Sequence, residues 1–371
     1  MNDKIYLPGL NGIRAIAALS VVFSHINNRL DYFKLPKSKL LDLANFGVTI
    51  FFTLSGFLIT YLLLKEKEKT GTINIKKFYI RRILRIWPLY FIYLLIVILL
   101  NGITTVQWPI LFVLLMIPNL RNSFAGVTNI AVGSNNLTYM VGHYWSLGVE
   151  EQFYAFWPWI IKKSKKLLQF LILFPLVYLF IKVILRLFHA PTGIITFFNY
   201  TRFGCLAIGA LGAYLYFNNN SKFNYWFTKK GLEISAWLLL LIVAFNKFHI
   251  TSIIDHEIIA VVTLIIIINQ ISNPKKIINL ENKTFDFLGK ISFGLYVYNP
   301  LVIYLMVFII NPFEIENPLL KQVLIYILVI PVVILTAYLS YNYFEKMFLK
   351  LKYNYAIIDS ASSKSEFEKL S

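Results

Sequence analysis

The sequence predicts an all-α fold, a polytopic integral membrane bundle of about ten transmembrane helices with one re-entrant or interfacial segment. Of its 371 residues, 58% are hydrophobic, whereas soluble domains contain about 45–50%. Apolar runs long enough to cross a bilayer, which takes about 20 residues, recur along the whole chain. Lysines and arginines gather in short loops between these runs, which is the positive-inside pattern of membrane proteins.

The apolar runs define the candidate spans. They lie near residues 10–28, 43–64, 86–103, 144–161, 167–185, 201–218, 231–247, 257–273, 288–311 and 319–344. Together they predict one transmembrane domain over residues 1–345. Residues 346–371 are basic and then polar, so a disordered cytoplasmic tail is expected there. Within the second span, Gly47 and Gly56 predict close packing against a neighbouring helix.

Loop charge indicates the side of the membrane that each connection occupies. Residues 65–85 and 162–166 are rich in lysine and arginine, so both connections are expected in the cytoplasm. An even number of crossings must separate them. The short run 106–120, which contains two prolines, would make that number odd if it crossed. Residues 104–146 are therefore expected to form an external, partly re-entrant segment, covered by protein where it enters the membrane.

One connection disagrees with this topology. The loop 29–42 carries Arg29 and three lysines, yet the count of crossings places it outside. The later loops outweigh it, and both termini are predicted to be cytoplasmic. The formal net charge of +18 is explained by loop anchoring, so membrane lipids rather than nucleic acid are the expected partners.

The first span carries two ionisable residues in an otherwise apolar stretch. Arg14 and His25 are eleven positions apart, which is a rise of about 16 Å along a helix. At about 100° per residue the two side chains differ by about 20° around the axis, so they share one face. We predict that both face one water-filled passage, with Arg14 near its inner end and His25 acting as a general base near its outer end. The alternative is a polar residue satisfied by a neighbouring helix.

Three arginines in the stretch 78–88 predict a cradle for phosphate. Arg81 and Arg85 are four positions apart and can share a helix face, with Arg82 beside them. The guanidinium fork matches phosphate oxygens. A phosphorylated co-substrate that approaches from the cytoplasm would meet this cradle. The alternative is a positive-inside stop that only anchors the helix.

Adjacent carboxylates mark the stretch 142–154. Ser146 can cap a helix that enters the membrane, and Glu150 and Glu151 then suit the positive end of the helix dipole. That is the purely structural interpretation. Because adjacent side chains point about 100° apart, at least one carboxylate is expected to face protein or a cavity. There it could orient His25 or hydrogen-bond an acceptor hydroxyl.

The remaining polar residues predict no metal site. One predicted outer loop is crowded by His249, Asp255, His256 and Glu257. Their spacing lacks the paired i, i+4 histidines of a zinc-binding helix. Arg202 flanks another outer loop and is interpreted as an interfacial residue.

These segments occur in the order found in one known family. The chain resembles the acyltransferase 3 family of bacterial integral membrane acyltransferases, which O-acylate cell-envelope glycans and some small molecules. The resembling segments are Leu10–Ala15 with Ser24 and His25, Phe51–Ile59, Phe78–Pro88 and Tyr144–Tyr154, with weaker matches at Ile291–Tyr296 and Tyr343–Glu345. Together they cover nearly the whole chain.

The resemblance implies roles for particular residues. The matching positions are Arg14 and His25 for an arginine–histidine motif whose histidine is catalytic, Arg82 and Arg85 for a cytoplasmic arginine pair, and Glu150 and Glu151 for a carboxylate element. There is one departure. Where many relatives carry Tyr-Leu-Trp-His, this chain has Tyr296-Val297-Tyr298-Asn299. Asn299 can hydrogen-bond but cannot shuttle a proton, so no catalytic role is expected of it.

The prediction is a membrane-bound O-acyltransferase of the bacterial cytoplasmic membrane. Acyl-CoA, with acetyl-CoA favoured, would bind from the cytoplasm with its phosphates near Arg81, Arg82 and Arg85. A hydroxyl of a cell-envelope glycan or lipid-linked sugar would arrive from outside. His25 would deprotonate it while Arg14 holds the co-substrate or the developing negative charge. The alternative is a transporter or flippase that moves a glycan or lipid without acyl transfer, because many spans, a broken segment and buried charges suit that class too.

Overall fold

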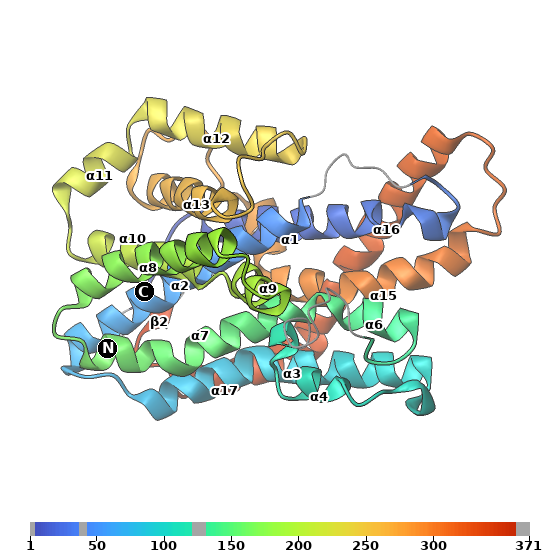
Figure 1. Cartoon of the computed structure of the whole chain (residues 1–371), viewed down its shortest axis with the longest axis horizontal. Helices are drawn as coiled ribbons and strands as arrows, with labels where there is room; N and C mark the ends of the chain where they lie inside the picture. The colour runs from blue at the N-terminus through green and yellow to red at the C-terminus, as the bar shows by residue number, and fades with distance from the viewer. Residues whose placement is uncertain (1–3, 37–42, 121–130, 361–371) are drawn as a thin grey trace.

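The computed structural model describes residues 4–36, 43–120 and 131–360, and most of these residues are helical. Most of the long helices run roughly along the long axis of the molecule (Figure 1). The elements are β1 Lys4–Ile5, α1 Leu10–Asn27, η1 Leu30–Phe33, α2 Ala44–Thr70, α3 Ile75–Asn101, η2 Ile103–Thr105, α4 Ile110–Leu114, α6 Asn135–Gly142, α7 Tyr144–Lys163, α8 Leu167–Leu187, α9 Thr192–Thr201, α10 Phe203–Phe217, α11 Ser221–Phe227, α12 Lys230–Ala244, α13 Asp255–Ser272, α14 Lys283–Lys290, α15 Ser292–Ile310, α16 Pro318–Ser340, the π-helical turn η3 Tyr341–Glu345, α17 Lys346–Tyr353 and β2 Asp359–Ser360.

Seven helical stretches within the described residues are long and apolar enough to cross a membrane. They are Phe46–Thr70, Ile75–Asn101, Leu167–Leu187, Thr192–Phe217, Asp255–Ser272, Ser292–Ile310 and Pro318–Tyr353. The other three predicted spans coincide with α1, α7 and α12. Helix α12 has only 15 residues, and α1 and α7 carry ionisable side chains. The chain is therefore an all-α, multi-pass bundle, and the count of about ten crossings stays a prediction.

Helices α2 and α10 cross at short distance because each carries glycine at the crossing. A Cβ atom at Gly56 would lie 1.9 Å from the carbonyl oxygen of Leu206, and one at Gly209 would lie 2.0 Å from the carbonyl oxygen of Thr53. These distances are far below van der Waals contact, so only glycine fits at either position. The close packing predicted for Gly56 is confirmed.

Two helix boundaries differ from the predicted spans. Helix α3 begins at Ile75, well before the predicted span 86–103, and the side chain of Asn74 caps it. The arginine stretch therefore lies on the first turns of a long helix. Arg202 has a left-handed backbone with φ of 43° and separates α9 from α10, so the predicted span 201–218 corresponds to α10 and α9 precedes it.

The predicted external segment 104–146 holds the short helices α4 and α6. Part of it packs against α3 and α7. Tyr90 donates a hydrogen bond to the carbonyl oxygen of Val113 at 2.7 Å, and a Cβ atom at Gly148 would lie 2.7 Å from Pro118 Cδ. The segment therefore reaches the interior of the bundle. Its re-entry into the membrane stays a prediction.

The tail predicted to be disordered from residue 346 is instead ordered over its first part. Helix α17 packs on α3, and β2 then pairs in parallel with β1. Both described ends of the chain therefore lie on the same side of the bundle (Figure 1). Arg81 donates to the carbonyl oxygen of Tyr355 at 2.9 Å and holds the connection between α17 and β2. These contacts with the bundle hold in place a segment that was predicted to be disordered. Residues 361–371 lie outside the described part of the chain.

Candidate functional site

Helix α1 presents its two ionisable side chains to two different cavities. Arg14 lines two adjoining pockets of about 130 and 140 Å³, both of which are also lined by Arg82 and Arg85; together we call them the Arg14 cavity. His25 lines a larger cavity of about 560 Å³, which we call the His25 cavity. The single passage predicted from the sequence is therefore divided into two.

A layer of hydrogen-bonded side chains lies between the two cavities. The hydroxyl of Tyr296 donates to the carbonyl oxygen of His143 at 2.8 Å and lies 2.5 Å from Ser146 Oγ. Tyr296 and Ser146 line the Arg14 cavity, whereas His143 lines the His25 cavity. The polar groups of this layer satisfy one another, so it closes the passage without leaving the Tyr296 hydroxyl unpaired. The physical reason for the division is thus the Tyr296 side chain in the middle of the bundle.

His25 is held by an amide rather than by either of the predicted carboxylates. Its Nδ1 lies 2.6 Å from Asn299 Oδ1. The amide nitrogen of Asn299 donates to the carbonyl oxygens of Leu295 and Tyr296 at 3.0 and 2.7 Å. These bonds fix the amide so that Oδ1, which can only accept, faces His25. We therefore assign the proton of the neutral imidazole to Nδ1 and its lone pair to Nε2, which is the arrangement of a general base. Sequence reasoning gave Asn299 no role because an amide transfers no proton.

A second imidazole, that of His143, lies beside His25 and received no role from the sequence. The two ring centroids are 6.3 Å apart, and His143 is only 6% exposed. Neither ring nitrogen of His143 makes a hydrogen bond of good geometry within the described residues, although backbone groups of Met140 and Val297 interact with the ring. A buried polar group without a well-formed hydrogen bond is unfavourable. A substrate hydroxyl in the His25 cavity would satisfy it. The sequence feature that could have pointed to His143 is its position directly before the predicted span 144–161.

The Arg14 cavity concentrates positive charge. Arg14 donates to Asn11 Oδ1 at 3.3 Å, and the Asn11 amide donates to Asp286 Oδ1 at 3.2 Å. Arg82 and Arg85 line both pockets of the cavity. Within the described ranges, none of these three guanidinium groups has a carboxylate at ion-pair distance. Neighbouring like charges repel, so an anionic ligand would stabilise this arrangement.

The structure places Arg81 apart from the other arginines. Its Nη2 forms an ion pair with Glu66 Oε2 at 3.0 Å, and the Glu66 side chain is 2% exposed. Its Nη1 donates to the carbonyl oxygen of Tyr355. Arg81 lines a neighbouring pocket of about 40 Å³ and not the Arg14 cavity. This geometry fits an anchor for the C-terminal segment better than a ligand for phosphate.

The adjacent carboxylates on α7 have separate surroundings. Glu150 lines the Arg14 cavity and accepts hydrogen bonds from Ser55 Oγ at 2.9 Å and from the Tyr154 hydroxyl at 3.1 Å. Glu151 accepts from Trp87 Nε1, on α3, at 3.3 Å. The predicted divergence of the two side chains is therefore present, and Glu150 is the one that reaches a cavity. Ser55 is a partner that sequence reasoning did not single out.

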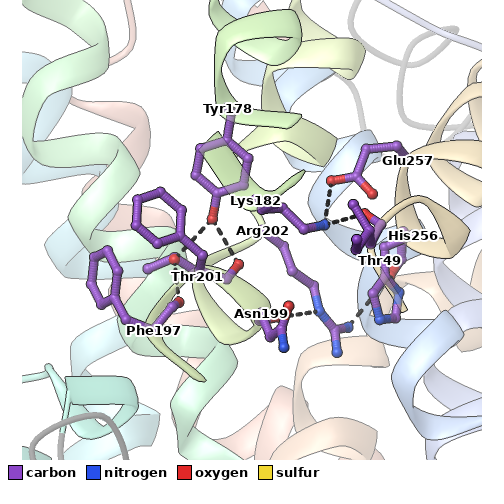
Figure 2. A network of polar contacts seen from close by, with 11 residues as sticks. Thr49, Tyr178, Lys182, Phe197, Asn199, Thr201, Arg202, His256 and Glu257 are labelled. Atoms are coloured by element: carbon purple, nitrogen blue, oxygen red, sulfur yellow. Dashed lines mark hydrogen bonds and ion pairs between the residues drawn. The ribbon is translucent and has the colours of Figure 1, made fainter. Parts of the chain in front are cut away.

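A separate buried polar cluster lies between α2, α8, α10 and α13 (Figure 2). We call it the Lys182 network, and its members are Lys182, Glu257, Arg202, His256 and Thr49. Lys182 forms an ion pair with Glu257 at 2.9 Å, and Arg202 donates to Thr49 Oγ1 at 3.4 Å. Arg202 is 6% exposed, so its interpretation as an interfacial residue is wrong. Over the described ranges, no three His, Cys, Asp or Glu side chains gather where they could hold a metal ion.

Aromatic rings line the His25 cavity. Trp145 and Tyr200 both line it and meet edge to face with centroids 5.0 Å apart. Arg202 Cζ lies 5.0 Å from the centroid of the Trp145 ring, so the Lys182 network supports this wall from behind. Arg29, the residue at odds with the positive-inside pattern, lies 3.7 Å from the ring centroid of Tyr139 and also lines the cavity. Rings with polar tips suit a ligand that carries both C–H and hydroxyl groups.

Comparison with known families matches residues 7–341 to the family described as Acyltransferase domain. "Putative O-acetyltransferase SACOL0978" of Staphylococcus aureus (strain COL) is 28% identical over 367 residues, which is 93% of this chain and 58% of that protein. "O-acetyltransferase OatA" of Staphylococcus aureus (strain NCTC 8325 / PS 47) is 26% identical over 378 residues, 93% of this chain and 57% of that protein. No solved structure matches.

The chain thus spans somewhat more than half the length of the curated relatives it matches. The family match includes α1, α3 and α7, which carry the ionisable residues of the two cavities. The match also covers the helical stretches that are long and apolar enough to cross a membrane, except for the C-terminal end of the last one. The chain therefore belongs to the acyltransferase 3 family, and it is a multi-pass membrane protein of that family.

Proposed function

We propose that the protein is an O-acetyltransferase that moves an acetyl group from cytoplasmic acetyl-CoA to a hydroxyl of a cell-envelope glycan or lipid-linked sugar. One observation carries the proposal: a single helix presents a cation to one cavity and an oriented imidazole to the other. The names of the two relatives support an acetyl group as the group transferred.

The donor occupies the Arg14 cavity. Its phosphates lie near Arg82 and Arg85, which have no ion pair within the described part of the protein. Guanidinium groups bind phosphate through paired, charge-assisted hydrogen bonds. The positive-inside pattern supports a cytoplasmic position for this end of the bundle. The thioester arm then extends along α1 toward His25.

The acceptor occupies the His25 cavity. Its volume of about 560 Å³ accommodates a sugar unit, and its wall combines aromatic rings with polar groups such as Asn135 and Thr138. The imidazole of His143 also lines the cavity and offers a further polar group to a sugar hydroxyl. These features favour a polyhydroxylated ring over a simple alcohol.

The reaction needs no covalent intermediate. His25 Nε2 takes the proton of the acceptor hydroxyl, and the oxygen attacks the thioester carbonyl carbon. The C–S bond breaks, and CoA leaves as the thiolate, which then takes up the proton that His25 accepted. Asn299 stabilises the imidazolium through Nδ1–H, and Arg14 stabilises negative charge on the donor. The side chain of Tyr296 must rotate first, because it separates the thioester from His25.

The test compares envelope glycans of a deletion strain complemented with different variants, using mass spectrometry. The unaltered gene is expected to restore an acetyl mass difference. His25→Ala should lower acetylation at least about a hundredfold, which is the usual contribution of a general base. His249→Ala is the matched control, because that histidine is far more exposed and lies outside both cavities. Glycans that change in amount but not in mass would favour a transporter and contradict the proposal.

A further inference from the structure

Lys352 extends the cationic lining beyond the segment that the family match covers. That match ends at residue 341, whereas Lys352 lies on α17, which follows it. The side chain of Lys352 lines the Arg14 cavity together with Arg14, Arg82 and Arg85. The C-terminal helix of this chain therefore contributes a fourth cation to a site that the sequence predicted from α1 and α3 alone.

The charges around this cavity are not balanced by the protein. Lys352 repels the charges of Arg85, Arg82 and Arg14. Lys352 lines two pockets. The one that it shares with Arg14 has one carboxylate, that of Asp286, which accepts its hydrogen bond from an amide, and the other has that of Glu66, which is paired with Arg81. Over the described residues, Lys352 has no ion pair. Four cations around one cavity destabilise the free protein unless an anion binds among them.

Two nearby carboxylates do not change this balance. Glu150 lines the adjoining pocket, where it accepts hydrogen bonds from two hydroxyl groups. Glu345 interacts with Arg85 electrostatically but accepts its hydrogen bond from Ser340 at 3.3 Å. Neither lies at ion-pair distance from the cations, in contrast to the pair that Arg81 makes with Glu66. An anion that entered the cavity would therefore meet cations with no competing partner at contact distance.

The position of Lys352 is fixed by contacts on both sides of it. The preceding residues pack on α3 through α17. Three residues after Lys352, the carbonyl oxygen of Tyr355 accepts from Arg81 at 2.9 Å. Further on, Asp359 and Ser360 pair with Lys4 and Ile5. A lysine on a free tail would lose much conformational entropy on binding, whereas this one is already held at the cavity.

We infer that Lys352 binds a phosphate group of CoA and that α17 is part of the donor site. The inference rests on the proposed function, because CoA is the phosphorylated donor assumed there. The 3′-phosphate and the diphosphate of CoA supply the anionic charge that the four cations lack. Arg81 is then a positioning residue, which holds the C-terminal segment so that Lys352 stays at the cavity.

The experiment measures CoA binding to the purified full chain by calorimetry, in nanodiscs of phosphatidylcholine so that no anionic lipid headgroup competes. Lys352→Ala is expected to raise the Kd for CoA about tenfold, which is the usual worth of one hydrogen bond to a charged group. Lys352→Arg should stay within about threefold of the unaltered protein, because its charge is kept. Lys350→Ala, an exposed lysine on the same helix, should leave Kd unchanged.

A second measurement separates binding from folding. Without CoA, Lys352→Ala should unfold at the same temperature or a higher one, because it removes a repelling charge. With CoA it should show a smaller stabilisation than the unaltered protein. Kinetics should show a raised KM for acetyl-CoA and an unchanged KM for S-acetylpantetheine, which lacks the 3′-phosphate and the diphosphate. A lowered unfolding temperature without CoA, or an equal effect on both donors, would overturn the inference.

The outcomes also distinguish this inference from the proposal beneath it. If Arg85→Ala weakens CoA binding but Lys352→Ala does not, the inference fails and the proposed donor site stands. If the unaltered protein binds no CoA, the proposed function fails and the inference with it. If Lys352→Ala leaves CoA binding unchanged but weakens the binding of negatively charged phosphatidylglycerol added to the nanodiscs, the ligand at this lysine is a lipid headgroup and the inference is overturned.

Discussion

The Arg14 cavity and the Lys182 network both place cations inside the bundle, but they satisfy the charge in opposite ways. In the Lys182 network the ammonium is paired with Glu257 at 2.9 Å, and Arg202 has an oxygen partner (Figure 2). Arg202 also lies against the ring of Trp145. In the Arg14 cavity, no cation of the described chain has an ion pair. The first arrangement is complete without a ligand, and the second is not.

This difference separates two uses of buried charge. A cation paired inside the protein contributes to the fold, because removing one partner leaves the other charged and buried. Cations that face a cavity without a counter-charge lower the stability of the free protein and favour an anionic ligand. The comparison therefore predicts that substitutions in the Lys182 network mainly change stability, and that substitutions at the two cavities mainly change activity.

The largest effect on folding is expected for Lys182→Met. The Glu257 carboxylate would then be buried without its counter-charge, which lowers the free energy of unfolding by about 3–5 kcal/mol. Thermal unfolding of the purified protein in detergent measures this loss. The double variant Lys182→Met with Glu257→Gln should recover most of it. Normal stability of Lys182→Met would remove the distinction between the two regions.

A smaller effect, on the chemical step, is expected for Asn299→Ala. Loss of the hydrogen bond to His25 Nδ1–H should lower kcat about ten- to a hundredfold, because that bond is strongest when the imidazole is charged. The KM values of donor and acceptor should change little. Asn299→Asp keeps an acceptor at the same place and should retain more activity than the alanine variant. A change in acceptor KM alone would contradict this role.

The smallest of the three effects is expected for Arg85→Ala. Loss of one guanidinium should raise the KM for acetyl-CoA about tenfold, while the KM for the acceptor stays unchanged. The unfolding temperature of the free protein should not fall, because Arg85 has no ion pair among the described residues. Equal changes in both KM values would show that this cavity does not discriminate donor from acceptor.

Much of this architecture follows from patterns that are local along the chain. Apolar runs predicted a helix at every one of the ten places proposed, and the glycine at position 56 predicted a close helix crossing. The spacing of Arg14 and His25 predicted one shared passage; each residue does line a cavity, but the two cavities are separate. Such inferences succeed because the rise and rotation of a helix are nearly constant.

Other features depended on residues far apart in the sequence. Asn299 meets His25 across 274 positions, and Tyr296 closes the passage between the cavities from the same helix, α15. The segment 346–353 was predicted to belong to a disordered tail, yet it forms α17 and brings Lys352 to the cavity. No local pattern reports these contacts, because a residue's own helix does not specify which neighbour packs against it.

The amino-acid order therefore specified the class of the protein and the chemical groups it can use: a membrane bundle with an imidazole, a set of guanidinium groups and paired carboxylates. Helix periodicity and the length of apolar runs are enough for that, since both act within one segment. Packing between segments settled which of these charges are paired, as Lys182 is, and which are left for a ligand. The reason is that ion pairs and hydrogen bonds act only at contact distance, and contact distance is set by the three-dimensional packing of the helices.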